Sequence, residues 1–379
     1  MTMPLSDLRI LVTGANGFIG KNLCVRLNEL QNICVYTFVR GDSILQLPQL
    51  VSQVDAVVHL AGENRPSDES AFVDVNVGLT SALCDAIRHE CETSDRHVPL
   101  VLTSSRQTVL QTPYGRSKLE AEQVLYSLSK ATGNPCTVFR LPGVFGKWCR
   151  PNYNSVVATF CHNLSRDLPI HINDASAEVC LVYIDDVVSS LLRTLEVPVP
   201  GFHSAAVCPE FCITLGALSD QLRSFANCRT TLVSQRVGTG LTRALYATYM
   251  SYLPSEKFSY QLEQHADPRG VFVEMLKTLD SGQFSYFTAH PGITRGGHYH
   301  HTKSEKFLVI KGKALFRFRH LLTDALVEVQ ASGASPKVVE SIPGWTHDIT
   351  NIGSDEMIVM LWANEIFNQL EPDTIVNPL

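Results

Sequence analysis

Residues 9–20 read RILVTGANGFIG. A short apolar run typical of a buried strand leads into Gly14, Gly17 and Gly20, and the following segment KNLCVRLNEL carries leucines on one helical face. Glycines let the backbone turn sharply and approach a pyrophosphate, and the N-terminus of the next helix offers free N–H groups. The stretch therefore predicts a dinucleotide-binding turn. The alternative is a glycine-rich strand–helix turn that holds no ligand.

The pattern around this turn extends to about residue 188. Strand-like runs alternate with helical segments, and the runs are RILVTG, CVYTFV, DAVVHLAG, PLVLTSS and CTVFRLP. Such alternation predicts an α/β, Rossmann-type doubly wound parallel sheet. After about residue 249 the segments become short and β-rich, typical of a sandwich or small barrel. We place a linker near 249–270 and predict two domains, 1–245 and 246–379.

Composition excludes several classes of protein. The 379 residues carry a net charge of −6, so no basic field would attract nucleic acid. The N-terminal stretch lacks a signal peptide's basic start, and no segment has the roughly 20 apolar residues needed to cross a bilayer. We therefore expect a cytoplasmic protein that binds neither nucleic acid nor membrane. Its 11 cysteines, all at or before Cys228, are then expected to be free thiols.

A second pattern, LTSSRQTVLQTPYGRSK, brings a tyrosine and a lysine onto one helical face. The ammonium of Lys118 would favour the phenolate of Tyr114 and lower its pKa. Such a tyrosine can pass a proton to or from a carbonyl or alcohol oxygen while hydride moves to the neighbouring carbon. A serine could hold the same oxygen, and both Ser104 and Ser105 are candidates. A tyrosine–lysine pair at this spacing is otherwise a common surface pair.

The end of the second strand, VYTFVRGD, bears on the choice of cofactor. Many NAD sites place a carboxylate there for the ribose 2′-OH, whereas an arginine suits a 2′-phosphate. Arg40 occupies that place and favours NADP(H). A solvated loop arginine is the equally open alternative.

A third stretch, residues 296–313, reads GGHYHHTKSEKFLVIKGK. On a strand, His298 and His300 point to one face while His301 points to the other. Glu305 begins the next strand, and His347 follows in IPGWTHDITN. Three imidazoles and a carboxylate predict a divalent metal site with nitrogen and oxygen ligands, with wet-strand histidines as the alternative. The ligand types alone would accept zinc, iron, nickel or manganese.

The motifs of the first half resemble the extended short-chain dehydrogenase/reductase family: the glycine turn, HLAG, Asn76, YGRSK and RLPGVFG. The resemblance covers about residues 9–245 and implies work on nucleotide sugars, with Ser105, Tyr114 and Lys118 as catalytic residues. The interval between Ser105 and Tyr114 is shorter than in most of the family, which implies a differently shaped pocket. The implied cofactor contacts are Gly14, Asn16, Gly17, Phe18, Ile19, Gly20, Arg40, Leu60, Ala61, Tyr114, Lys118 and Leu141.

Two further segments would bind the sugar nucleotide. They are HLAGENRP and FGKWCRPNYNSVVATF, whose basic and aromatic residues suit a diphosphate and a uracil. The predicted substrate contacts are Asn64, Arg65, Lys147, Arg150, Asn152 and Asn154. Structural roles for Trp148 and Tyr153 are equally open.

The histidine-rich half resembles the all-β cupin (jelly-roll) family. The first cupin motif is reproduced by the spacing from Gly292 to Gly312, and most of the second by Gly344, His347 and Asn351. A proline sits directly before Gly344, one place from its usual position. The resemblance implies His298, His300, Glu305 and His347 as metal ligands, with His301 outside that set. The stretch DPRGVFVE also resembles the start of deoxysugar 3,5-epimerase cupins.

The order of the two parts resembles a family of bifunctional capsular-polysaccharide enzymes. In that family the cupin epimerises C3 of a UDP-2-acetamido-2,6-dideoxy-4-hexulose. The reductase then converts the C4 ketone with NADPH to a UDP-2-acetamido-2,6-dideoxy-L-talose, on the route to UDP-N-acetyl-L-fucosamine. The resemblance implies zinc and a homodimer. One alternative is a reductase whose cupin only binds or dimerises, and another is a nucleotide-sugar sensor without turnover.

Overall fold

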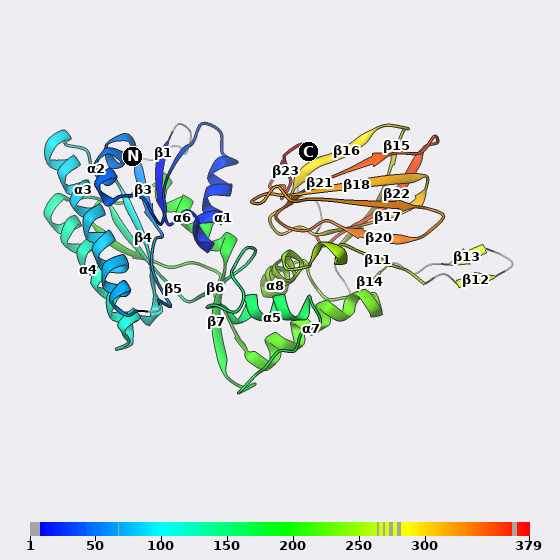
Figure 1. The fold of residues 1–379 in the computed structure, drawn as a ribbon, viewed down its shortest axis with the longest axis horizontal. Helices are drawn as coiled ribbons and strands as arrows, with labels where there is room; N and C mark the ends of the chain where they lie inside the picture. Colours follow the sequence, from blue (N-terminus) through cyan, green and yellow to red (C-terminus); the bar gives the residue numbers. More distant parts are fainter. Residues whose placement is uncertain are drawn as a thin grey trace. The chain divides into compact units, whose positions relative to one another are not determined.

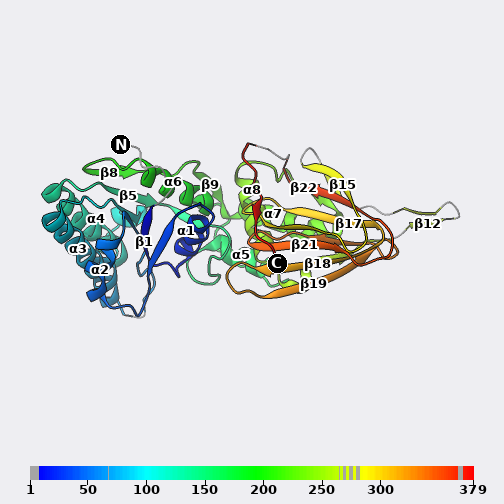
Figure 2. The same cartoon turned by 90° about the horizontal axis from the view of Figure 1, so that it is seen from above.

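The computed structural model describes residues 8–379 apart from 67, 264, 268–269, 273–275, 279–281 and 366–369 (Figures 1 and 2). The chain forms two compact units, which are described separately. The first unit comprises Met1–Arg150 and Cys180–Cys212, and the second comprises Pro151–Val179 and Ile213–Leu379. Arg269 and Glu274, which belong to the epimerase-like stretch, lie outside the described residues.

The first unit is built on a six-stranded parallel sheet in the order β2-β1-β3-β4-β5-β8. Its strands are β1 (Arg9–Thr13), β2 (Cys34–Phe38), β3 (Ala56–His59), β4 (Leu100–Ser105), β5 (Cys136–Leu141) and β8 (Phe202–Ala205). Its helices are α1 (Phe18–Asn28), α2 (Leu47–Gln53), α3 (Leu79–Ser94), α4 (Pro113–Thr132) and α6 (Ile184–Glu196). The strand order reverses direction between β1 and β3. In such sheets ligands bind at the carboxyl ends of the strands beside this switch point.

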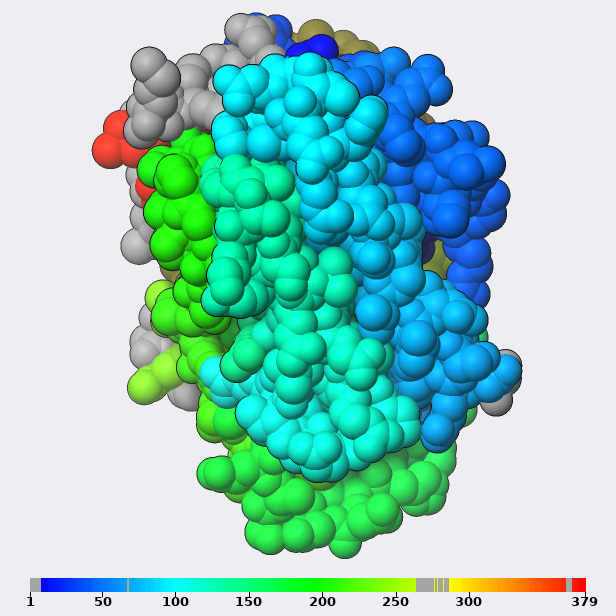
Figure 3. Space-filling model, turned by 90° about the vertical axis from the view of Figure 1, so that its left-hand side faces the viewer, coloured from blue at the N-terminus to red at the C-terminus, as the bar shows by residue number. Residues whose placement is uncertain are grey.

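The core explains why these segments form strands. Side chains of β1, β3 and β4 pack with buried leucines and isoleucines of α3 and α4, including Leu83, Ile87 and Leu125. Figure 3 shows the outer surface that α3 and α4 (cyan to blue-green) form on this unit. Burying one such side chain contributes about 1.5–3 kcal/mol, so the apolar runs favour this layer. A small sheet completes the unit: β6 (Gly143–Phe145), β7 (Glu178–Tyr183) and β9 (Phe211–Thr214).

The second unit contains two antiparallel five-stranded sheets, ordered β11-β20-β17-β22-β15 and β19-β18-β21-β16-β23. The first holds β11 (Ser259–Gln261), β20 (Lys337–Glu340), β17 (Glu305–Lys311), β22 (Met357–Ala363) and β15 (Gln283–Ala289). The second holds β19 (Leu326–Ser332), β18 (Lys313–His320), β21 (Trp345–Asn351), β16 (Thr294–Tyr299) and β23 (Ile375–Val376). Phe307 of one sheet and Phe316 of the other stack with ring centroids 5.6 Å apart, so the sheets share a core. The predicted fold class, a Rossmann-type α/β sheet followed by an all-β region, is confirmed.

The remaining elements of the second unit are helical or short. They are α5 (Val156–Leu164), α7 (Leu215–Thr231), α8 (Gly240–Ser251), β10 (Val233–Ser234), β12 (His265–Asp267), β13 (Gly270–Phe272) and β14 (Lys277–Thr278). The three helices cluster with the β-sheets, although α5 and α7 precede the predicted boundary at residue 245 and α8 spans it. A buried ion pair from Arg229 of α7 to Glu340 of β20 is one reason. The boundary between residues 245 and 246 stays a prediction about independent folding. The expected linker already contributes β11 to a sheet.

One expectation about the cysteines is wrong. Cys180 and Cys212 form a disulfide between β7 and β9, whereas the other nine cysteines are free. Their Cα atoms lie 4.2 Å apart because these strands are neighbours in the small sheet. Separately, among the helices of the described residues none is long and apolar enough to span a membrane.

Candidate functional site

The glycine turn lies between β1 and α1, at the switch point of the parallel sheet. Gly14 has φ of +68°, and a Cβ there would lie 2.6 Å from the main-chain nitrogen of Ala61. A Cβ on Gly20 would lie 2.3 Å from the carbonyl oxygen of Gly14. These contacts require glycine, because the turn packs directly on the end of β3 and on the start of α1. Gly17 caps α1 without a side-chain hydrogen bond, which leaves the helix N-terminus available to an anion.

Other predicted cofactor contacts gather at the same edge. Asn16 is exposed in the turn, and Phe18 and Ile19 are half-buried in the first turn of α1. Leu60 and Ala61 follow β3, and their N–H groups each donate to the hydroxyl of Thr13 at 3.2 Å. Leu141 ends β5 and pairs in register with Ser105 at the end of β4. The carboxyl ends of four neighbouring strands therefore meet where a dinucleotide would lie, which agrees with the predicted position of the cofactor.

Tyr114 and Lys118 lie one turn apart near the start of α4, which the hydroxyl of Thr112 caps by accepting from the N–H of Gly115. The ammonium of Lys118 is buried and donates to the carbonyl oxygen of Thr103 at 2.8 Å. Gly62 lies close by, since a Cβ on it would lie 3.6 Å from that ammonium nitrogen. The geometry thus brings the glycine-turn side of the sheet and the tyrosine–lysine pair together.

The charge properties of the pair differ from the sequence-based expectation. Burial raises the pKa of Tyr114, and a hydrogen bond with Ser105 only partly opposes this. Burial lowers the pKa of Lys118 to about 8, with Glu122 opposing. The predicted lowering of the Tyr114 pKa by Lys118 is therefore wrong for this structure. The physical reason is that the Lys118 ammonium hydrogen-bonds the main chain of β4, while desolvation dominates at the phenol.

The two candidate serines occupy different environments. Ser105 accepts a hydrogen bond from the N–H of Gln107 and interacts with Tyr114. The hydroxyl of Ser104 is buried and has no hydrogen-bond partner among the described residues. Ser105 is therefore the serine that the geometry associates with Tyr114.

Asn76 is one of the residues that carry the family resemblance, and its side chain links the loop after β3 to α4. Its side chain accepts from the N–H of Glu63 at 2.8 Å and donates to Ser117 at 2.9 Å. The pairing of Glu63 with Arg40 was not readable from the sequence. The Arg40 side chain is 86% exposed just past β2, so its guanidinium is accessible to a ligand.

The predicted substrate contacts belong to both units and differ in burial. Asn64 is half-buried, and its side-chain oxygen is buried without a hydrogen-bond partner among the described residues, whereas Arg65 is exposed. Lys147 is buried, and its ammonium donates to Asp185 at 2.7 Å. Asp185 is thus the ion-pair partner of Lys147 among the described residues, and a substrate contact of Lys147 stays a prediction. No sequence motif identified Asp185 as this partner.

The last three predicted substrate contacts are exposed. Arg150 closes the first stretch of the first unit, whereas Asn152 and Asn154 belong to the second unit. Asn152 has φ of +54°, and its N–H donates to the hydroxyl of Thr159. A substrate role for these three residues stays a prediction.

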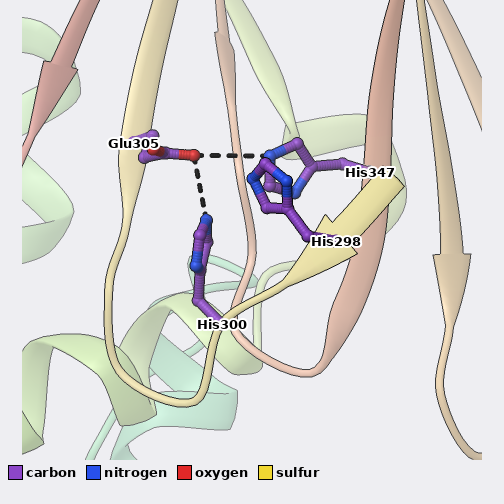
Figure 4. Close-up of side chains that lie close together, drawn as sticks. All are labelled: His298, His300, Glu305 and His347. Carbon is purple, nitrogen blue, oxygen red and sulfur yellow. Dashed lines mark hydrogen bonds and ion pairs between the residues drawn. The ribbon is translucent and has the colours of Figure 1, made fainter. Parts of the chain in front are cut away.

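The four predicted metal ligands converge in the second unit (Figure 4). His298 on β16 pairs directly with His347 on β21, and Glu305 begins β17 in the facing sheet. The Glu305 carboxylate lies 3.0 Å from Nε2 of His300 and 3.3 Å from Nε2 of His347. All four residues offer ligand atoms within 4.8 Å of one another. The cluster therefore lies between the two sheets, inside the β region of residues 259–376.

A β-bulge aims the first ligand. The register between β16 and β21 shifts from Gly296 to His298, and Gly296 and Gly297 both have positive φ. One extra residue at this point turns the strand so that His298 faces His300, with ring centroids 5.0 Å apart. Tyr299 and His301 contact each other instead, which agrees with the predicted alternation of faces.

The donor set fits a divalent metal ion. Burial lowers the pKa of His298 to about 3 and also lowers that of His347, so both imidazoles are neutral near pH 7 and can donate a lone pair. Burial opposes ionisation of Glu305, but His300 and His347 hold its pKa well below the usual value. A four-coordinate ion with bonds of about 2.0–2.2 Å separates its ligand atoms by about 3.3–3.6 Å, close to the observed spacing.

Two protein-family models match the chain, one in each half. Residues 10–207 match the NAD dependent epimerase/dehydratase family, and residues 265–375 match the polysaccharide biosynthesis C-terminal domain. Over 367 residues the chain is 55% identical to the UDP-2-acetamido-2,6-beta-L-arabino-hexul-4-ose reductase of Pseudomonas aeruginosa. That alignment covers 97% of this chain and 98% of the relative.

Solved structures show the same similarity. The capsular polysaccharide assembling protein CapF from Staphylococcus aureus is 37% identical with a TM-score of 0.62, covering 98% of this chain and 100% of that one. WbmF of Bordetella bronchiseptica, solved in complex with NADH, is 19% identical with a TM-score of 0.52. That match covers 59% of this chain and 78% of the WbmF chain, and it supports only the fold of the first half.

The parallel sheet, the glycine turn and the tyrosine–lysine pair define a nucleotide-binding oxidoreductase class. The chain belongs to the NAD dependent epimerase/dehydratase family. The similarity to CapF along nearly the whole chain agrees with the resemblance to capsular-polysaccharide enzymes.

Proposed function

We propose that this protein acts on a UDP-2-acetamido-2,6-dideoxy-4-hexulose at two sites. The β region exchanges the configuration at C3, and the first unit then reduces the C4 ketone with NADPH to a UDP-2-acetamido-2,6-dideoxy-L-talose. The observation that carries the reductase step is 55% identity, over almost the full length of both chains, to a protein named as a UDP-hexul-4-ose reductase. The convergence of Ser105, Tyr114 and Lys118 beside the glycine turn supports the same reaction.

In the reductase step, NADPH supplies hydride to C4. Tyr114 delivers its phenolic proton to the C4 oxygen, so that the ketone gains one hydride and one proton and becomes an alcohol. Ser105 holds that oxygen in place, and Lys118 ties α4 to the end of β4 through the carbonyl oxygen of Thr103. The raised pKa of Tyr114 suits this direction, because the phenol carries its proton before the reaction.

The preference for NADPH rests on Arg40, which lies just past the end of β2, where the carboxylate of Asp42 is engaged by the N–H of Val39 at 2.7 Å. Residues 38–40 are Phe, Val and Arg, whereas an NAD site commonly has an acid there. The nearby carboxylate of Glu63 pairs with Arg40 and would have to share it with a 2′-phosphate.

In the epimerase step, the C4 ketone makes the C3 proton acidic. His298, His300, Glu305 and His347 would hold a divalent metal ion, and zinc suits three imidazoles and one carboxylate. A bound ion would act as a Lewis acid toward negative charge on the ketone oxygen. Cysteine is absent from this donor set, and iron, nickel or manganese would also be accepted.

Three residues are candidates for the group that moves the C3 proton. Lys303 is buried, with its ammonium 3.5 Å from the Glu305 carboxylate. His301 is half-buried, and His290 is exposed at the end of β15. Lys303 is the candidate that we favour, because its ammonium contacts the carboxylate of a proposed metal ligand.

The deciding experiment incubates the protein with NADPH and the UDP-4-keto sugar in D2O. We expect oxidation of NADPH together with deuterium at C3 above the level of a protein-free control. The variant Glu305→Gln should lose the C3 label, because it weakens the metal site. Full labelling by this variant, or by metal-stripped protein, would refute metal catalysis. Absence of C3 label above the control in the wild type would favour the alternative in which the cupin only binds or dimerises.

Further features belong to the same proposal. The UDP-sugar is the proposed partner, and a homodimer is expected from the resemblance. Cytoplasmic location also stays a prediction.

A further inference from the structure

The C-terminal segment 373–377 lies along the strand that carries the proposed metal ligands. It contains β23, which pairs antiparallel with β16, matching Val376 with His298 and Ile375 with Tyr299. The N–H of Asn377 donates to the carbonyl oxygen of Gly297 at 2.8 Å. This segment is about 70 residues beyond His300 in sequence, and nothing in the predicted motifs includes it.

Asp373 binds the loop between His300 and Glu305 through its side chain. Its carboxylate accepts three consecutive main-chain N–H groups, from His301 at 2.8 Å and from Thr302 and Lys303 at 2.7 Å each. It also accepts the hydroxyl proton of Thr302 at 2.9 Å. Four donors on one carboxylate fix the loop's backbone, since charged acceptors make the stronger hydrogen bonds.

The main chain of Asp373 acts on a ligand directly. Its carbonyl oxygen lies 2.5 Å from Nδ1 of His300. A carbonyl can only accept, so Nδ1 carries a proton, and in the neutral ring Nε2 keeps its lone pair for a metal ion. That same Nε2 faces Glu305 at 3.0 Å, where the ion would lie. Hydrogen bonds of this kind orient metal-binding imidazoles and set their tautomer.

Two neighbouring contacts also hold the loop of residues 301–303 in place. The hydroxyl of Thr374 accepts from the ammonium of Lys303 at 3.0 Å, which aims Lys303 beside Glu305. Arg243 of α8 pairs with Glu365 at 2.9 Å and hydrogen-bonds Thr302. The loop is therefore held from the C-terminal segment and from a helix of the same unit.

We propose that Asp373 is a positioning residue of the metal centre, which orients His300 and fixes the 301–303 loop so that His300, Lys303 and Glu305 face one point. The proposal rests on the metal site of the proposed function. A purely structural reading has the segment only complete the sheet. The two readings differ in whether the metal's surroundings respond to Asp373.

The test compares Asp373→Ala with Glu371→Ala, which removes an exposed acid two residues earlier. Zinc affinity is measured in the full-length proteins by competition with a chromophoric chelator, and the d–d absorption spectrum is recorded after loading with cobalt(II). We expect Asp373→Ala to bind zinc about 10–100-fold more weakly and to show an altered spectrum. Glu371→Ala should match the wild type in both.

Further arms separate the possible failures. If the wild type binds no metal, the proposed metal site itself falls, and this inference falls with it. If the wild type binds metal and Asp373→Ala binds it with the same affinity and spectrum, only the positioning role is overturned. Asp373→Asn keeps one acceptor oxygen, and its zinc affinity should lie between that of the wild type and that of Asp373→Ala. It also provides a readout if Asp373→Ala does not fold, which circular dichroism and NADPH binding would reveal.

Discussion

Two buried lysines, one in each unit, have pKa shifts of opposite sign. Lys118 in the first unit donates to a neutral carbonyl oxygen, and burial lowers its pKa to about 8. Lys306 in the second unit is also desolvated, but it pairs with Glu340, and this holds its pKa well above the usual value. The difference shows that burial alone does not decide the charge of a lysine. The counter-charge does, and it separates a lysine suited to a reaction from one suited to packing.

The same contrast separates the two candidate sites. The first is assembled from strand ends and one helix turn, and its shape comes from the backbone at Gly14 and Gly20. The second is assembled from side chains on three strands of two sheets and from His300, which directly follows β16. The first site tolerates few substitutions at its glycines, because the backbone forms its shape. The second site depends on the hydrogen bonds that orient each of its ligand side chains.

The largest expected effect is the loss of reduction in Tyr114→Phe. Removing the phenolic proton leaves the C4 oxygen without a donor, and we expect the rate of NADPH oxidation to fall by about 10²–10⁴-fold. Tyr126→Phe on the same helix is the matched control, since that ring is 51% exposed. C3 deuteration should persist in both variants. Normal reduction by Tyr114→Phe would exclude Tyr114 as the proton donor, whereas absence of NADPH oxidation in the wild type would support the sensor alternative.

A slightly smaller effect concerns the buried cluster around Lys306. Glu340 pairs with Lys306 and also with Arg229 of α7, so Glu340→Gln leaves two buried cations without a counter-charge. We expect the free energy of unfolding of the second unit to fall by about 3–5 kcal/mol, measured by denaturant titration. Glu356→Gln, at an exposed site, should change it little. Equal stability of the two variants would show that the carboxylate of Glu340 is not what allows Lys306 to stay charged when buried.

The pH dependence of stability gives a third test. Between pH 8 and 10.5 the unfolded chain holds a proton on Lys118 that the folded chain has released. Stability therefore rises with pH across this window, by about 3 kcal/mol at most. Lys118→Met should remove this rise, and the comparison is made by denaturant titration of the first unit at each pH. An unchanged pH slope in the variant would show that Lys118 is not desolvated.

The smallest effect is expected at Arg40. Its side chain is exposed, so Arg40→Ala should leave stability unchanged while weakening NADPH by about tenfold, the cost of one screened contact to a 2′-phosphate. Affinity for NADH should not change, and fluorescence titration measures both. A parallel loss for the two cofactors would assign Arg40 a general role. Arg88→Ala on α3 is the control for loss of an exposed arginine.

Much of the fold could be predicted because its signals are local. Apolar runs, a three-glycine turn and strand-spaced histidines each lie within about twenty residues, and each became the expected element. The four candidate ligands were found for the same reason, since the spacing in 298–305 carries three of them. The ion pair of Lys147 with Asp185 could not be predicted, because Asp185 lies 38 residues away and carries no motif.

The sequence by itself determined the order of the two halves, the glycine turn, the tyrosine–lysine pair and the identity of the imidazole and carboxylate donors. The tertiary structure alone decided the pKa of Tyr114, the partners of Lys147 and Arg40, the grouping of α5, α7 and α8 with the β-sheets, and the contact between Asp373 and His300. The physical reason is that backbone preference and side-chain periodicity act over a few residues. Desolvation and hydrogen bonding depend on neighbours that only the folded chain brings into contact.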